Sequence, residues 1–316
     1  MTATMRVPAQ TKVAVLMGGW SAEREVSLSS GKACRQALLN AGFNAVELDP
    51  QPDTLFAQLA SIKPDVVFNA LHGKWGEDGK AAAIFETLRI PYTHSGVLAS
   101  AIAIDKEKSK IMFRTAGIPV AESRIVPLQD AATRHVMPPP YVVKPVAEGS
   151  SVGVHIVLAT HNGPAASILD ERNLFGDHAM VERFIPGREL TCAVMGDVAL
   201  GVIDIVSNKG NFYDYASKYE SGGSDHILPA QIPADIYRKC QKYALMAHDV
   251  LGCRGVSRCD FRYDDVTPDK QELVLLEINT QPGMTGTSLV PDMARHAGHS
   301  FEELVTWMVN DASVDR

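Results

Sequence analysis

The sequence lacks the features that mark several classes of protein. No run of apolar residues approaches the ~18 to 20 that a membrane-spanning helix needs. The five cysteines are odd in number and form no CxxC pair, which argues against a disulfide framework or a zinc ribbon and favours a reducing compartment. The N-terminal residues carry too little positive charge and too short an apolar run for a secretion signal. We therefore expect a cytoplasmic protein that does not contact a membrane.

Positive charge and the common nucleotide-binding signatures are also scarce. There are 30 Lys and Arg residues against 37 Asp and Glu, a net charge of −7 that would repel a nucleic-acid backbone, so we expect no nucleic-acid partner. The chain contains neither GxxxxGK[ST] nor GxGxxG, and so gives no support to a P-loop or Rossmann enzyme. What it does contain, 46% hydrophobic residues in a length of 316, predicts a globular protein of two or three domains.

The first hundred residues alternate apolar strands with amphipathic helices, which is typical of a parallel α/β sheet. We expect strands at 13–17, 45–48 and 65–71 and helices at 25–41, 54–62 and 78–88. Because ligands bind beyond the carboxyl ends of parallel strands, the loops 18–25 and 71–79 are candidate binding loops.

The rest of the chain has the pattern of antiparallel α+β units. Helices are expected over 97–117, near 165–173, over 236–250 and after the capping box that begins at Ser300. Strands are expected at 123–127, 141–144, 154–158, 180–184, 190–195, 198–206, 256–263 and 272–279.

Two late strands carry polar side chains on one face. Residues two apart on a strand point the same way, so Glu277 lies beside Asn279, and Arg258 beside Asp260. If the strands are neighbours, two carboxylates, one amide oxygen and one guanidinium converge. Carboxylate and amide oxygens of this kind are ligands that suit Mg²⁺. Either strand alone is better explained by an exposed face with one ion pair. Both together, within runs as apolar as LVLLEI, favour a metal site, because an unpaired polar group there costs free energy.

Two further segments have the chemistry of a nucleotide site. In YVVKPVAEGSSVG, Lys144 precedes a glycine-rich turn that could present N–H groups to a phosphate, although hairpin turns of this composition are common. In VERFIPGREL, Glu182 and Glu189 flank an apolar turn that could hold adenine and ribose. An edge strand with surface glutamates explains this second segment about as well.

Seven motifs, in one order from Gly18 to Pro291, carry a family resemblance. They are GGWSAEREVSLSSG, LHGKWGEDG, YTHSGVLASAIAIDK, VVKPVAEGSSVG, FYDYASKY, RCDF and EINTQPGMTGTSLVP. Together they closely resemble the D-alanine–D-alanine ligases, which are ATP-grasp carboxylate–amine ligases of cell-wall synthesis. The resemblance implies an α/β and α+β protein with the ATP-grasp fold. It implies an N-terminal parallel α/β substrate-binding domain over 1–104, and a central lobe over 105–188 and a C-terminal lobe over 189–316 that enclose ATP.

The resemblance also implies a role for individual residues at the ATP end of the site. The phosphates would be contacted by Lys106 and Lys144. Adenine would be contacted by Glu182 and by the backbone of Phe184 and Ile185. Ribose would be contacted by Glu189, and Phe212 would also lie at ATP. Asp260, Glu277 and Asn279 would hold two Mg²⁺ ions, for which Mn²⁺ could substitute, with Glu277 bridging them.

At the substrate end, the resemblance assigns Glu23 to the ammonium of a first D-alanine and links it through Ser150 to Tyr219. His72 would lie near this substrate, while Lys218, Ser288 and the Leu289 backbone would hold the second D-alanine. Arg258 and the Gly283 N–H would stabilise the oxyanion of a tetrahedral intermediate. Without the resemblance, a histidine in a glycine-rich loop is better explained by a structural role.

The implied reaction joins two D-alanines through D-alanyl phosphate, for peptidoglycan precursor synthesis, in an enzyme that we expect to be a homodimer. The polar, glycine-rich segment 207–225 predicts a lid that orders only on ligands. Two alternatives stay open. A ligase that joins D-alanine to a hydroxy acid such as D-lactate is disfavoured by the pair Lys218 and Tyr219. A non-catalytic nucleotide-binding relative is disfavoured because Arg258, Asp260, Glu277 and Asn279 are all present.

Overall fold

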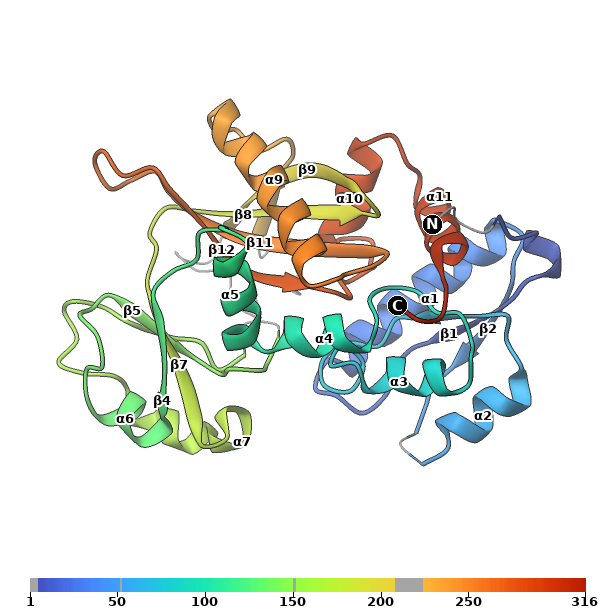
Figure 1. Cartoon of the computed structure of the whole chain (residues 1–316), viewed down its shortest axis with the longest axis horizontal. Coiled ribbons are helices and arrows are strands. Elements are labelled where there is room, and N and C mark those ends of the chain that lie inside the picture. The colour runs from blue at the N-terminus through green and yellow to red at the C-terminus, as the bar shows by residue number, and fades with distance from the viewer. Residues whose placement is uncertain (1–4, 52, 150–151, 208–223) are drawn as a thin grey trace.

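The computed structural model describes residues 5–51, 53–149, 152–207 and 224–316. They form three sheets with helices packed around them, and α4 and α5 run between the N-terminal sheet and the other two (Figure 1). No helix in these ranges is long and apolar enough to cross a membrane. All five cysteines are buried free thiols.

The N-terminal sheet is parallel, as the sequence predicts. Its strands are β1 (Lys12–Leu16), β2 (Asn44–Leu48) and β3 (Val66–Asn69), in the order β2-β1-β3. The turn η1 (Pro8–Gln10) leads into β1, and the helices of this part are α1 (Arg24–Asn40), α2 (Leu55–Ile62) and α3 (Lys80–Thr87). The loops after β1 and β3 therefore leave the same edge of the sheet, because parallel strands end there together.

The middle sheet is antiparallel, with strand order β4-β7-β5-β6. It contains β4 (Ser123–Pro127), β5 (Tyr141–Lys144), β6 (His155–Val157) and β7 (His178–Arg183), preceded by α4 (Val97–Ile104) and α5 (Lys106–Thr115). The sequence did not indicate the short helix α6 (Leu128–Thr133). The helix expected near 165–173 is instead η2 (Ala166–Glu171) followed by the single turn α7 (Arg172–Phe175), which ends at Gly176 with φ 68°.

The third sheet is antiparallel, with strand order β10-β9-β8-β11-β12. Its strands are β8 (Arg188–Met195), β9 (Val198–Ser207), β10 (Ser224–Ile227), β11 (Val256–Asp264) and β12 (Glu272–Asn279). β10 was expected to be part of the polar loop, but it pairs with the end of β9, so the two ends of segment 207–225 are strand residues. The helix α9 (Ala234–Val250) packs on this sheet.

Two helices close the chain, α10 (Leu289–His296) and α11 (Phe301–Asp311). The capping box at Ser300 is confirmed, because its hydroxyl accepts from the N–H of Glu303, whose carboxylate accepts from the N–H of Ser300. The sequence pattern did not indicate α10. These helices do not pack on the third sheet alone, since Val305 and Met308 share a core with Val13 and Leu38 of the N-terminal part. The C-terminal helices therefore tie the first and third sheets together.

Candidate active site

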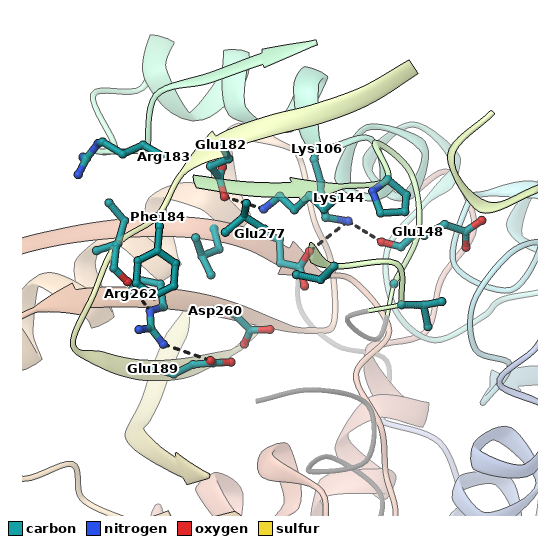
Figure 2. A pocket seen from close by; sticks show the side chains of 17 residues that line it. Lys106, Lys144, Glu148, Glu182, Arg183, Phe184, Glu189, Asp260, Arg262 and Glu277 are labelled. Atoms are coloured by element: carbon teal, nitrogen blue, oxygen red, sulfur yellow. Dashed lines mark hydrogen bonds and ion pairs between the residues drawn. The ribbon is translucent and has the colours of Figure 1, made fainter. Parts of the chain in front are cut away.

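Two pockets meet at Gly149 and Glu277, which line both. The first lies between the middle sheet and the third sheet, and Figure 2 shows Lys106, Lys144 and Glu277 among the side chains that point into it. The second lies between the loops of the N-terminal sheet and the segment that follows β12. The two pockets are therefore adjacent, with Gly149 and Glu277 at their boundary.

Two predicted phosphate lysines line the first pocket. Lys144 ends β5, and its Nζ lies 2.6 Å from Oε1 of Glu182. Lys106 begins α5, and its Nζ donates to the backbone oxygen of Glu148 and lies 3.4 Å from Oε2 of Glu277. Both side chains are almost buried, so their charges lie in a poorly hydrated space. Their attraction for a polyphosphate is stronger there than it would be in water.

Glu182 lies between two lysines. Its second carboxylate oxygen accepts from Lys110, whose side chain is wholly buried. Burial alone would raise the pKa of Glu182, but Lys144 and Lys110 outweigh it and hold the pKa below its ordinary value. Lys110 was not predicted as a site residue, although it lies one turn after Lys106 on α5 and so on the same helix face. Glu182 is therefore an anionic acceptor fixed in place at the wall of the pocket.

The apolar turn after β7 forms the far end of this pocket, with Phe184, Ile185 and Glu189 in its lining. Arg262, from β11, holds the turn: its Nε donates to the Ile185 oxygen at 3.0 Å and one Nη to the Gly187 oxygen at 2.9 Å. The other Nη lies 3.5 Å from Glu189, and the guanidinium carbon lies 5.8 Å from the centre of the Phe184 ring (Figure 2). Sequence analysis missed Arg262 as well, although it continues the spacing of two residues set by Arg258 and Asp260.

The predicted metal ligands do come together. In the pairing of β11 with β12, Asp260 faces Glu277 and Arg258 faces Asn279. The Asn279 amide donates to the Asp260 carboxylate at 3.0 Å, and Thr191 on β8 donates to its other oxygen at 2.7 Å. Two carboxylates and an amide on neighbouring strands are the oxygen donor set that Mg²⁺ uses, and they face the same space as the lysines. The residues present therefore fit a magnesium site.

The second pocket is lined by Glu23, His72, Arg258, Gly283, Ser288 and Leu289, all of which were predicted. Glu23 precedes the first residue of α1, and its carboxylate reaches between two glycine turns. A Cβ at Gly73 or Gly149 would come within 3.2 or 3.4 Å of Oε1 of Glu23. Ser288 and Leu289 begin α10, whose N-terminal N–H groups favour a carboxylate. This pocket thus offers an anion for an ammonium and a helix end for a carboxylate.

Four predicted residues, Ser150, Phe212, Lys218 and Tyr219, lie outside the described residues, as does most of the predicted lid. Their roles stay predictions.

The chain is similar in sequence to known proteins over most of its length. The family profile described as "D-ala D-ala ligase C-terminus" matches residues 112–310. The chain is 60% identical over 304 residues to the D-alanine–D-alanine ligase of Parvibaculum lavamentivorans, which covers 96% of this chain and 98% of that protein. It is 58% identical to D-alanine–D-alanine ligase B of Mesorhizobium japonicum, covering 95% of this chain and 97% of that one.

The chain is also similar in structure to solved ligases over most of its length. The D-alanine–D-alanine ligase from Bacillus anthracis complexed with ATP superposes with a TM-score of 0.79 at 27% identity, covering 95% of this chain and 97% of that chain. A D-Ala:D-Ser ligase from Enterococcus faecalis superposes with a TM-score of 0.75 at 29% identity, covering 95% and 98%.

Proposed function

The chain belongs to the D-alanine–D-alanine ligase family, and we propose that it joins two D-alanines into D-alanyl-D-alanine while ATP becomes ADP and phosphate. Its fold is the ATP-grasp fold of that family. The names of the relatives favour D-alanine over D-lactate as the second substrate, and they favour an enzyme over a non-catalytic nucleotide-binding protein. The product would serve peptidoglycan precursor synthesis.

The observation that carries this proposal is the junction of the two pockets at Gly149 and Glu277. One pocket has the charges and the apolar turn that a nucleoside triphosphate needs. The other has the anion and the helix end that amino acids need. Their junction brings the γ-phosphate to the carboxylate of the first D-alanine, as phosphoryl transfer requires.

In the first step, a carboxylate oxygen of the first D-alanine attacks the γ-phosphorus, and the bond to the bridging oxygen breaks, so ADP leaves. Glu23 holds the ammonium of this D-alanine, and Lys106 and Lys144 neutralise charge on the transferred group. Glu182 accepts from the adenine amino group, with the Phe184 and Ile185 backbone beside the ring, and Glu189 accepts from the ribose. The step needs position and charge more than covalent help from the protein.

In the second step, the neutral amine of the second D-alanine attacks the acyl carbon of D-alanyl phosphate. Phosphate leaves and takes up the proton that the amine gives up, so that the peptide bond forms. Arg258 and the Gly283 N–H stabilise the oxyanion, and Ser288 and the Leu289 N–H hold the carboxylate of the incoming substrate. His72 shapes the wall of the first subsite.

Asp260, Glu277 and Asn279 would hold Mg²⁺, two ions with Glu277 between them, and Mn²⁺ would be accepted at the same oxygens. When bound, the metal neutralises phosphate oxygens. We also propose that Ser150, Lys218 and Tyr219 complete the substrate site, that Phe212 contacts ATP, and that the enzyme is a cytoplasmic homodimer.

The test is the product itself. Protein incubated with ATP, Mg²⁺ and D-alanine should give the mass of D-alanyl-D-alanine, and adding D-lactate or D-serine should give at most a minor mixed product. A dominant depsipeptide with D-lactate would replace the proposal by its hydroxy-acid alternative. Nucleotide binding without any product would support the non-catalytic alternative.

A further inference from the structure

The two loops that form the second pocket are joined by a buried pair of amides. Asn69 ends β3 before the loop that carries His72, and Gln281 follows β12 just before Gly283. The Asn69 Nδ2 donates to Oε1 of Gln281 at 2.6 Å, and the Gln281 Nε2 donates to the oxygen of Leu71. Both side chains are buried, at 4% and 5% exposure. Buried amides persist only when they are paired, so each one fixes the place of the other.

A second connection runs through a serine on α1. Ser30 is completely buried, accepts from the N–H of Met284 at 3.2 Å and lies 3.1 Å from Nε2 of His72. The Nδ1 of His72 lies 3.2 Å from a carboxylate oxygen of Glu77. The backbone N–H of Met284 donates to Ser30. With the proton of a neutral His72 on Nδ1, which faces the Glu77 carboxylate, the bonds align in one direction: Met284 to Ser30, Ser30 to His72, and His72 to Glu77.

Together these connections hold the turn around Gly283 from both sides. Gln281 is fixed before it, and the N–H of Met284 is fixed after it. The next N–H, of Thr285, donates to Oγ of Ser288 at 2.9 Å. The turn that presents the Gly283 N–H is therefore attached at residue 281 to the His72 loop and at residue 284 to α1.

We propose that Ser30, Asn69 and Gln281 are positioning residues. They fix the position of the proposed oxyanion donor, the Gly283 N–H, relative to the loop that carries His72. The inference rests on the proposed function, since it deepens the role given to Gly283. None of the three has to touch the reacting atoms. In this arrangement both ring nitrogens of His72 are engaged, one with Ser30 and one with Glu77, so His72 links the two loops by position.

Misplacing a catalytic group by about 1 Å can lower a rate by about 10²-fold. Ser30→Ala should therefore lower kcat by about 10- to 100-fold and leave the KM for ATP within about threefold. It should also lower the affinity for a phosphinate dipeptide analogue, which mimics the tetrahedral oxyanion, by about the same factor as it lowers kcat. A residue with only a packing role would lower stability without this selective loss.

Ser27→Ala is the matched control. Ser27 lies one turn earlier on α1, is equally buried, and bonds the backbone of Gly18 and Ala70, away from the Gly283 turn. We expect it to lower stability as Ser30→Ala does while kcat stays within about threefold of the wild type. If the two variants have the same kcat and the same phosphinate affinity, the proposal is wrong.

The amide pair gives an independent test if Ser30→Ala does not fold. Asn69→Leu removes the donor to Oε1 of Gln281, and Gln281→Leu removes an acceptor of Asn69 and the side-chain donor to the Leu71 oxygen. The double variant replaces both amides by apolar groups and should recover part of the stability. The proposal expects kcat of the double variant to stay low although part of its stability returns. Recovery of kcat together with stability would contradict it.

Amide hydrogen exchange separates failure of this inference from failure of the proposed function. Exchange over residues 282–286 should be faster in Ser30→Ala than in Ser27→Ala, whatever reaction the protein catalyses. A wild type that makes no dipeptide would refute the proposed function. Unchanged exchange in an active enzyme would refute the positioning role.

Discussion

Arg258 and Asp260 lie two residues apart on β11, and the guanidinium of the first donates to both carboxylate oxygens of the second, at 2.9 and 2.7 Å. Glu277, which faces Asp260 across the ladder, lies 3.4 Å from Nζ of Lys106. The proposed oxyanion donor Arg258, the proposed metal carboxylates and the proposed phosphate lysine Lys106 are thus parts of one network of charges. Changing one charge should affect the chemistry far more than the fold.

Glu277→Gln keeps the shape of the side chain and removes its charge. Because this charge faces Lys106 and would face the proposed Mg²⁺, we predict a fall in kcat of at least ~100-fold at saturating Mg²⁺, with little change in the free energy of unfolding. Glu47→Gln, the same change on an exposed part of β2, is the control and should leave kcat unchanged. Near-normal turnover of Glu277→Gln would place the metal elsewhere.

Arg262→Met should act on nucleotide binding. It removes the bonds that hold the Ile185 and Gly187 carbonyls and a partner of Glu189, so the proposed adenine and ribose contacts would lose their fixed geometry. We predict a rise of about tenfold in the KM for ATP, equivalent to about 1.4 kcal/mol, with a smaller change in kcat. Steady-state kinetics with varied ATP measures both. A change in kcat alone would show that Arg262 serves the chemical steps and not the nucleotide.

Lys110→Met tests the buried pair with Glu182. Removing one partner of a buried ion pair leaves the other poorly compensated, so we predict a loss of about 3 kcal/mol in the free energy of unfolding. The loss is limited because Lys144 still pairs with Glu182. Lys108→Met, on the same helix but with a largely exposed side chain, should change stability by less than about 1 kcal/mol. Urea denaturation of the two variants makes the comparison, and equal losses would contradict it.

Stability should fall on mild acidification because of buried histidines. Burial lowers the pKa of His94 to about 3 and that of His248 to about 4. Below about 6.5 the unfolded chain takes up protons that the folded one does not, so each histidine should cost about 2 kcal/mol of stability at pH 5. His94→Asn, which suits the left-handed φ of 68° at this position, should make the loss from pH 7 to pH 5 smaller by that amount. An unchanged pH dependence would show that His94 is not the group that titrates.

Much of the fold follows from local pattern. The parallel sheet and the strands β4, β5 and β12 follow from apolar runs between turn residues, and the observed bounds agree with the expected ones to within about two residues. The spacing of two residues on each strand also predicts that Arg258, Asp260, Glu277 and Asn279 share one face, and the pairing of β11 with β12 brings them together. The short helix α6 and the helix α10 could not be found this way. α10 begins in a glycine-rich motif, and its apolar residues become buried only against distant parts of the chain.

The residues missed in the site share one property. Lys110, Arg262, Ser30 and Gln281 act through partners that lie far away in the sequence, such as Glu182 for Lys110 and Met284 for Ser30. A periodic pattern can place such a residue on the correct face of a helix or strand. It cannot predict which residue becomes the partner of that side chain across a pocket, because the partner depends on how the three sheets pack together.

The most direct test of the account is ADP release with alanine of each hand. The account predicts release that depends on D-alanine and Mg²⁺, with one ADP per D-alanyl-D-alanine formed. It predicts background rates with L-alanine. Glu23 would fix the ammonium, the proposed oxyanion donors would fix the carboxyl group, and the wall shaped by His72 would meet the methyl group, so three substituents of one stereocentre are fixed. Equal ADP release with both enantiomers, or none with D-alanine, would contradict it.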